Sequence, residues 1–153
     1  LIKNVFELDD TPVSGVYTPL SKVFTLPEHT SLKNAINALR EQRYSRIPIT
    51  TANRKKVLGV LHAKDLLRAK LEPTIAGISV TELMRKPVTA TPSTRMNALF
   101  RKLKESKTHM AVVESEQGEP LGVVTMDDLL DVLFDDLLTA ESEDEDEDKD
   151  KGA

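Results

Sequence analysis

Apolar residues recur at helical spacing in two stretches of the chain, 32–39 and 96–103. Each stretch places four apolar side chains on one face of a helix: Leu32, Ala35, Ile36 and Leu39 in the first, and Met96, Leu99, Phe100 and Leu103 in the second. A proline and a Ser/Thr cluster precede each stretch, and hydroxyl side chains of this kind cap the start of a helix. The pattern therefore predicts two amphipathic helices, each with one apolar face for a core.

Pairs of short apolar segments follow each predicted helix, and a polar turn, TANRKK or SEQGEP, joins the members of each pair. We predict that these segments are strands, at 46–50 and 57–61 and again at 110–114 and 121–125. Each half of the chain also begins with a short extended segment, Val23–Leu26 or Val88–Ala90, and ends with a second helix, from about Ala63 or from Met126. Each half is thus predicted to run strand, helix, strand, strand, helix.

The two halves are copies of one unit. GVLHAKDLL at 59–67 matches GVVTMDDLL at 122–130, and SRIPI at 45–49 matches HMAVV at 109–113. A unit of about 60 residues buries too little apolar surface to fold comfortably alone, and two copies are too few for an open solenoid. We therefore expect an α+β fold in which the two copies pack sheet to sheet with pseudo-twofold symmetry.

Charge and composition mark the remaining segments. Residues 135–153 contain ten acids and two lysines, whereas 1–134 carry a net charge of +4. We expect a lead-in at 1–15, a first repeat at 16–71, a linker at 72–86 with a short helical VTELMRK, a second repeat at 87–137, and a disordered acidic tail at 138–153. The first residue is leucine, so we expect the chain to be a fragment of a longer protein.

Several functional classes find little support in the sequence. Cysteine is absent, which excludes disulfides and thiolate metal sites, and no apolar run approaches the ~20 residues of a membrane span. The three histidines, His29, His62 and His109, have spacings that suggest no metal cluster. There is no nucleophile triad and no phosphate-binding Gly-rich loop, so we expect no enzyme. The basic residues are scattered without interleaved aromatics, which disfavours nucleic-acid binding.

The second copy ends in a polar constellation, Gly122-Val-Val-Thr125-Met-Asp127-Asp128. Thr125 falls where a helix should begin and Asp128 lies three residues later, close to the capping-box pattern. The same residues suit a ligand, because a helix N-terminus attracts phosphate and a carboxylate accepts hydrogen bonds from ribose hydroxyls. Capping and ligand binding both remain open on this evidence.

The doubled unit with Gly-x-x-Thr-x-x-Asp resembles a cystathionine-β-synthase (CBS) domain pair, or Bateman module. More narrowly, YTPLSKVF, SRIPI, GVLHAKDLL and GVVTMDDLL resemble the cytosolic module of the CorC, hemolysin-C-like and cyclin-M (CNNM) proteins. One departure is Tyr17, where that family usually has Met. The resemblance implies a regulatory, non-catalytic homodimeric module on the cytoplasmic side of a membrane protein linked to magnesium or cobalt transport. Residues 1–15 would then lead in from an upstream transmembrane domain.

The resemblance also implies an adenine nucleotide, ATP or AMP/ADP, possibly with Mg²⁺, in a cleft between the copies. Carried onto this chain, the site combines ten residues: Tyr44, Ser45, Arg46, Ile47 and Pro48, then Thr125, Asp127 and Asp128, with Lys22 and Phe24 as additions. The mirror site keeps Asp65 but has His62 in place of the hydroxyl, so we expect one functional site and treat His62 as structural. The alternative is a ligand-free dimerisation scaffold.

Overall fold

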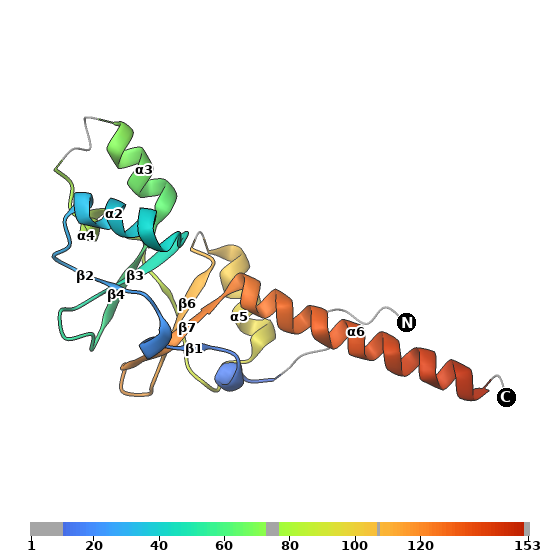
Figure 1. Cartoon of the computed structure of the whole chain (residues 1–153). Helices are drawn as coiled ribbons and strands as arrows, with labels where there is room; N and C mark the ends of the chain where they lie inside the picture. The colour runs from blue at the N-terminus through green and yellow to red at the C-terminus, as the bar shows by residue number, and fades with distance from the viewer. Residues whose placement is uncertain (1–10, 73–76, 107, 152–153) are drawn as a thin grey trace.

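The computed structural model describes residues 11–72, 77–106 and 108–151, and in it each half of the chain has the predicted order of elements (Figure 1). The first half contains β2 (Leu26–Pro27), α2 (Leu32–Gln42), β3 (Arg46–Thr50), β4 (Val57–His62) and α3 (Ala63–Leu71). The second contains β5 (Val88–Ala90), α5 (Met96–Glu105), β6 (Met110–Glu114), β7 (Pro120–Thr125) and α6 (Met126–Lys151). The α+β fold of two equivalent repeats is confirmed.

The two sheets repeat the same pairings. In the first, the order is β2-β3-β4, with β2 parallel and β4 antiparallel to β3. In the second, β5, β6 and β7 pair in the same way, and β1 (Thr18–Pro19) adds a fourth strand beyond β7. Even the register shift recurs, between Ile49 and Thr50 in one sheet and between Val113 and Glu114 in the other. The pseudo-symmetry therefore extends to irregularities of the backbone.

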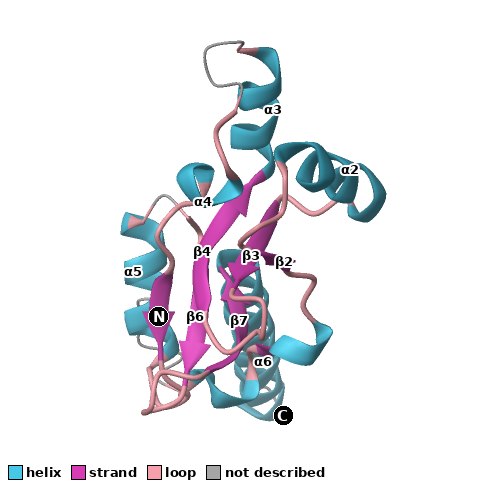
Figure 2. Cartoon of the chain, turned by 90° about the vertical axis from the view of Figure 1, so that its left-hand side faces the viewer, coloured by secondary structure: helices cyan, strands magenta, loops and turns pink. Residues whose placement is uncertain are grey.

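Each half has its own core between its sheet and its helices. In the first half, the apolar stripe of α2 packs on a cluster of Ala35, Ile49, Leu61, Leu66 and Val80. In the second half, Leu99 and Leu103 of α5 are fully buried with Leu129 of α6. A third cluster, Val60, Met110 and Val123 with Val23, joins the two sheets. Figure 2 shows the strands of both sheets in the middle of the molecule, with helices outside, as expected for sheet-to-sheet packing.

The segment that precedes each repeat pairs with the sheet of the other repeat. β1 precedes the first repeat, yet its Thr18 pairs with Val123 of β7. Arg85 precedes the second repeat, and its backbone exchanges hydrogen bonds of 2.8 and 2.9 Å with Val60 of β4. Because Val60 uses its backbone groups on Arg85, Pro48 can lie opposite Val60 in the sheet without the loss of a ladder hydrogen bond.

The short helical turns that precede the two repeats likewise pack in the core of the other repeat. The 3-10 turn η1 (Val13–Gly15) buries Val13 in the core of the second half, and α4 (Val80–Leu83) buries Val80 in the core of the first. Val13, which falls in the expected lead-in at 1–15, is thus part of the core of the second half. Residues 1–10 lie outside the described residues.

A glycine lies at each point where the segment that precedes one repeat passes close to a strand of the other repeat. A Cβ added to Gly122 would overlap the backbone carbonyl of Thr18 and the ring of Tyr17. A Cβ at Gly59 would lie 2.6 Å from Sδ of Met84 and 2.9 Å from the carbonyl oxygen of Arg85. Gly122 and Gly59 are therefore required for close backbone approach within the fold rather than for contact with a ligand.

Two expected boundaries are wrong. The first strand was expected at Val23–Leu26, but β2 covers only Leu26–Pro27, because the turn η2 (Leu20–Lys22) directs Val23 into the cluster between the sheets instead of into a ladder. The expected disordered tail is also wrong, since α6 continues to Lys151. No glycine or proline lies between Met126 and Lys151, and glutamate and lysine favour helix. None of the described helices is both long and apolar enough to cross a membrane.

Candidate functional site

The start of α6 carries a reciprocal cap. Oδ2 of Asp128 accepts a 2.9 Å hydrogen bond from the backbone N–H of Thr125, and Oγ1 of Thr125 accepts a 3.1 Å bond from the N–H of Asp128. Both side chains are partly buried, whereas Asp127 is exposed. The predicted capping arrangement is confirmed. It fixes the Thr125 hydroxyl and the Asp128 carboxylate in place at the positive end of the helix dipole.

The first-repeat residues 44–48 of the candidate site follow α2: Tyr44 and Ser45 precede β3, and Arg46, Ile47 and Pro48 lie in it. Arg43 ends α2 in a left-handed conformation, with a φ of 58°, and Tyr44 follows with 48 % of its surface exposed. The Tyr44 ring stacks on Phe24, with ring centroids 6.0 Å apart. Ile47 and Pro48 are buried in β3. The pair of rings offers a flat apolar surface of the kind that stacks on an aromatic ligand.

Arg46 contributes a donor without an acceptor. Within the described residues its Nε is buried and has no hydrogen-bond partner. A buried unsatisfied donor costs about 1–3 kcal/mol, and an anion is the acceptor that a guanidinium satisfies best. Ser45 and Arg46 border a cavity of about 340 Å³, with His62, Lys64 and His109 among its other lining residues. This side chain therefore fits a phosphate-bearing ligand.

A single segment of chain connects the two groups of site residues. After β1 pairs with β7, η2 contacts β7 and ends at the exposed Lys22. Two residues later Phe24 stacks on Tyr44. No hydrogen bond or ion pair joins residues 44–48 to residues 125–128 within the part of the chain that the structure describes. The two groups are thus linked through the sheets and this segment, not by direct polar contact.

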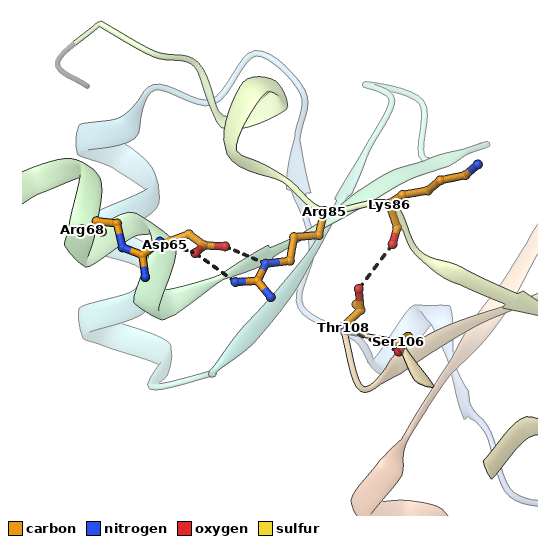
Figure 3. A network of polar contacts seen from close by, with 6 residues as sticks. All are labelled: Asp65, Arg68, Arg85, Lys86, Ser106 and Thr108. Atoms are coloured by element: carbon orange, nitrogen blue, oxygen red, sulfur yellow. Dashed lines mark hydrogen bonds and ion pairs between the residues drawn. The ribbon is translucent and has the colours of Figure 1, made fainter. Parts of the chain in front are cut away.

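The mirror position at the start of α3 is built differently. Arg85 donates to both carboxylate oxygens of Asp65, at 2.9 and 3.0 Å, and Arg68 lies 4.0 Å from the same carboxylate (Figure 3). The hydrogen bonds from Arg85 lower the pKa of Asp65 below its ordinary value. Both oxygens of the Asp65 carboxylate therefore already accept hydrogen bonds from one guanidinium, unlike the carboxylate of Asp128. Sequence reasoning missed Arg85, because nothing in the linker pattern links it to a residue twenty positions earlier.

His62 precedes α3 at the N-cap position but makes no capping hydrogen bond. Its side chain is only 4 % exposed, and Nε2 has no partner within the described residues. Burial, with the positive charges of Arg85 and Arg46, lowers the pKa of His62 to about 4. His62 is therefore neutral at physiological pH. No group of three or more His, Cys, Asp or Glu side chains suited to a metal ion occurs among the described residues.

Comparison with known proteins identifies the repeat. The family model described as "CBS domain" matches residues 13–72 and 80–135. The chain is 28% identical over 90% of its length to the magnesium and cobalt efflux protein CorC of Pasteurella multocida, and 29% identical over 90% to that of Vibrio cholerae. It covers only 45% and 47% of those relatives, so it spans less than half their length.

Solved structures agree with this assignment. The CBS domain of a bacterial CNNM/CorC family Mg²⁺ transporter, in complex with ATP, has a TM-score of 0.76 and 30% identity, covering 85% of this chain and 92% of that one. A hemolysin-like protein from Oenococcus oeni shares the fold at a TM-score of 0.73 and 24% identity, over 84% and 94% of the two chains. The chain therefore belongs to the CBS domain family, as a tandem pair homologous to the CBS domains of CorC and CNNM proteins.

Proposed function

We propose that this CBS pair is a regulatory module that senses an adenine nucleotide, ATP or AMP/ADP, on a membrane protein linked to magnesium or cobalt transport. The site combines Tyr44–Pro48 with Thr125, Asp127 and Asp128, with Lys22 and Phe24 at its edge. Its role is binding and not catalysis, and ATP would bring Mg²⁺ with it. The module acts as a homodimer on the cytoplasmic side of the membrane, attached to a transmembrane domain of the same protein.

The observation that carries this proposal is the buried Nε of Arg46, which has no hydrogen-bond partner in the described part of the chain, on the strand that follows the stacked Phe24–Tyr44 pair. An aromatic surface beside an anion-seeking guanidinium suits a ligand that has a flat base and phosphates. The prearranged Thr125–Asp128 pair suits the sugar hydroxyls. Similarity to a CBS domain crystallised with ATP points to the same class of ligand.

Regulation would follow from differential affinity. A nucleotide that contacts both repeats binds best to one relative arrangement of the two sheets, and that arrangement becomes more populated when the nucleotide is present. The larger the difference in nucleotide affinity between the two arrangements, the more strongly nucleotide binding can shift the conformation of the attached membrane domain.

A ligand-free scaffold is the second candidate, and one observation favours it. The bonds between Thr125 and Asp128 complete the cap of α6, so both residues already have a structural role. In this case the pair of repeats would serve dimerisation alone.

Replacing Asp128 by alanine separates the two candidates. We expect calorimetric titration to show that at least one of ATP, ADP and AMP, with or without Mg²⁺, binds the wild-type module. In Asp128→Ala the Kd should rise at least about tenfold, because hydrogen bonds to a charged group contribute ~1.5–3 kcal/mol. If the wild type binds none of these nucleotides, the result would instead support the ligand-free scaffold.

The matched control is Asp131→Ala, which removes an exposed carboxylate one turn further along α6. Loss of the cap in Asp128→Ala costs about 0.5–2 kcal/mol of stability, so denaturant midpoints of both variants must show that they are folded at the titration temperature. Equal nucleotide binding by wild type and folded Asp128→Ala would rule out the assigned site.

A further inference from the structure

The turns that join β3 to β4 and β6 to β7 occupy equivalent places in the two repeats but carry opposite charges. The first, which we call the basic turn (residues 51–56), contains no acid and three bases: Arg54, Lys55 and Lys56. The second, which we call the acidic turn (residues 114–119), contains no base and three acids: Glu114, Glu116 and Glu119. The two repeats therefore present matched charges of opposite sign at equivalent positions.

Hydrogen bonds within each turn hold its backbone in place. In the basic turn, the N–H of Thr51 donates to the carbonyl oxygen of Lys56 at 3.0 Å. In the acidic turn, the N–H of Ser115 donates to the carbonyl oxygen of Glu119 at 2.8 Å, and Gly118 supplies the positive φ, 82°, that the turn requires. Both sets of charges are thus carried on ordered backbone, so a partner would not have to order a loop on binding.

The two turns lie on the same side of the molecule, the side away from the C-terminal end of α6 (Figure 1). Nη2 of Arg54 donates a 2.9 Å hydrogen bond to the carbonyl oxygen of Leu20 in η2. The η2 turn also contacts β7, which begins directly after Glu119. The basic turn, η2 and β7 are therefore neighbours, and the acidic end of α6 points away from them.

The charges of both turns are accessible to a partner. Five of the six charged side chains are exposed, and that of Glu114 is partly buried. None of the six takes part in an ion pair within the part of the chain that the structure describes. This side of the molecule therefore presents a positive patch and a negative patch, each without a countercharge of its own.

We propose that this side docks against the same side of a second copy of the chain, with the basic turn of each copy on the acidic turn of the other. A twofold axis that runs between the two turns exchanges them, so both contacts join opposite charges. A partner that is uniformly acidic or basic would meet its own charge at one of the two turns. The inference goes beyond the proposed function, because it does not depend on a nucleotide.

The contact is weak and sensitive to salt, because each exposed ion pair contributes little and is screened by ions. It is therefore additional to the larger apolar interface that a stable homodimer needs. Modules attached to one membrane would have a high effective concentration, at which weak contacts between copies become populated.

The test is sedimentation velocity at increasing protein concentration in about 0.1 M and about 1 M NaCl, between which the screening length falls from ~10 to ~3 Å. We expect the average sedimentation coefficient of the wild type to rise with protein concentration at low salt and much less at high salt. A low-salt sedimentation coefficient that does not rise with concentration would overturn the proposal.

Charge reversal shows whether the two turns are the surfaces in contact. Lys55→Glu/Lys56→Glu makes both turns acidic, and Glu116→Lys/Glu119→Lys makes both turns basic. In each variant alone the Kd of association should rise by at least about tenfold, since like charges then face each other. An equimolar mixture of the two variants should associate again, because every acidic turn then meets a basic one.

The variant with all four substitutions keeps the net charge of the wild type and exchanges the signs of the two turns, so it should associate like the wild type. The matched control for net charge is Lys33→Glu/Lys70→Glu, which reverses two exposed lysines outside the turns and should retain the association. The proposal is overturned if either reversed variant, shown to be folded by its denaturant midpoint, associates like the wild type, or if their mixture does not associate. Neither turn contains a residue of the assigned nucleotide site, so calorimetric titration of the four-substitution variant tests nucleotide binding separately.

Discussion

Replacement of Gly122 by alanine is expected to destabilise the protein by about 3 kcal/mol, the upper end of the typical range for overpacked sites. The added methyl group would overlap the carbonyl of Thr18, and a backbone carbonyl cannot move aside by a change of rotamer. Relief would require β1 to separate from β7, which removes a strand from the second sheet. Denaturant unfolding of the variant and the wild type measures the effect.

Two other glycines provide graded controls. Gly59→Ala meets the flexible side chain of Met84 as well as the Arg85 carbonyl, so we expect a smaller loss of about 1–2 kcal/mol. In Gly15→Ala, none of the described residues has a heavy atom within 4 Å of the new methyl group, so the variant should stay within about 0.5 kcal/mol of the wild type. Equal stability of Gly122→Ala and Gly15→Ala would show that β1 does not lie against β7.

Acid should destabilise the protein between pH 6.5 and 4 through His62. The folded-state pKa is about 4 and the ordinary value is 6.5, so only the unfolded chain gains a proton on this residue in that interval. The stabilisation is complete above pH 6.5 and declines as the pH falls toward 4. A shift of this size corresponds to a loss of about 3 kcal/mol in the free energy of unfolding.

The measurement is the free energy of unfolding at several pH values across this interval. His62→Thr places a hydroxyl where the second repeat has Thr125. In this variant the free energy of unfolding should change less with pH, whatever the effect of the substitution on absolute stability. His29→Gln, which removes a histidine whose side chain is 85 % exposed, is the matched control. A slope that is the same in His62→Thr would assign the acid sensitivity to other groups. Asp65, whose pKa is lowered, loses its contribution only at lower pH.

The repeat could be predicted from sequence because the spacing of apolar side chains directly indicates the helices and strands. The stripes of α2 and α5 and the apolar runs of β3, β4, β6 and β7 are local patterns, and their similarity in the two halves implies a pseudo-symmetric pair. β1 and the Arg85 bridge could not be predicted, because a two-residue strand and a single bridge have no periodicity. The helical tail could not be predicted from net charge, because the helix propensity of glutamate and lysine opposes the effect of charge repulsion.

Part of the candidate site could likewise be predicted from the sequence, and part could not. The Thr125–Asp128 cap depends on spacing within one turn of helix and was visible in the sequence. The stacking of Phe24 on Tyr44 and the pairing of Asp65 with Arg85 join residues about twenty positions apart in the chain. Such contacts arise only when the folded chain brings distant segments together, so neither the ring pair nor the Asp65–Arg85 pair could be predicted from the sequence.

The exchanged leading segments have a consequence for where this protein can be divided. A first repeat cut out at residues 16–71 would lack Val80 from its core and would expose the edge of β4 that Arg85 covers. A second repeat produced alone would lose β1 and Val13. The unit that is repeated in the sequence is therefore smaller than the unit that folds: a first repeat needs the chain as far as Arg85, and a second repeat needs the segment from Val13 to β1.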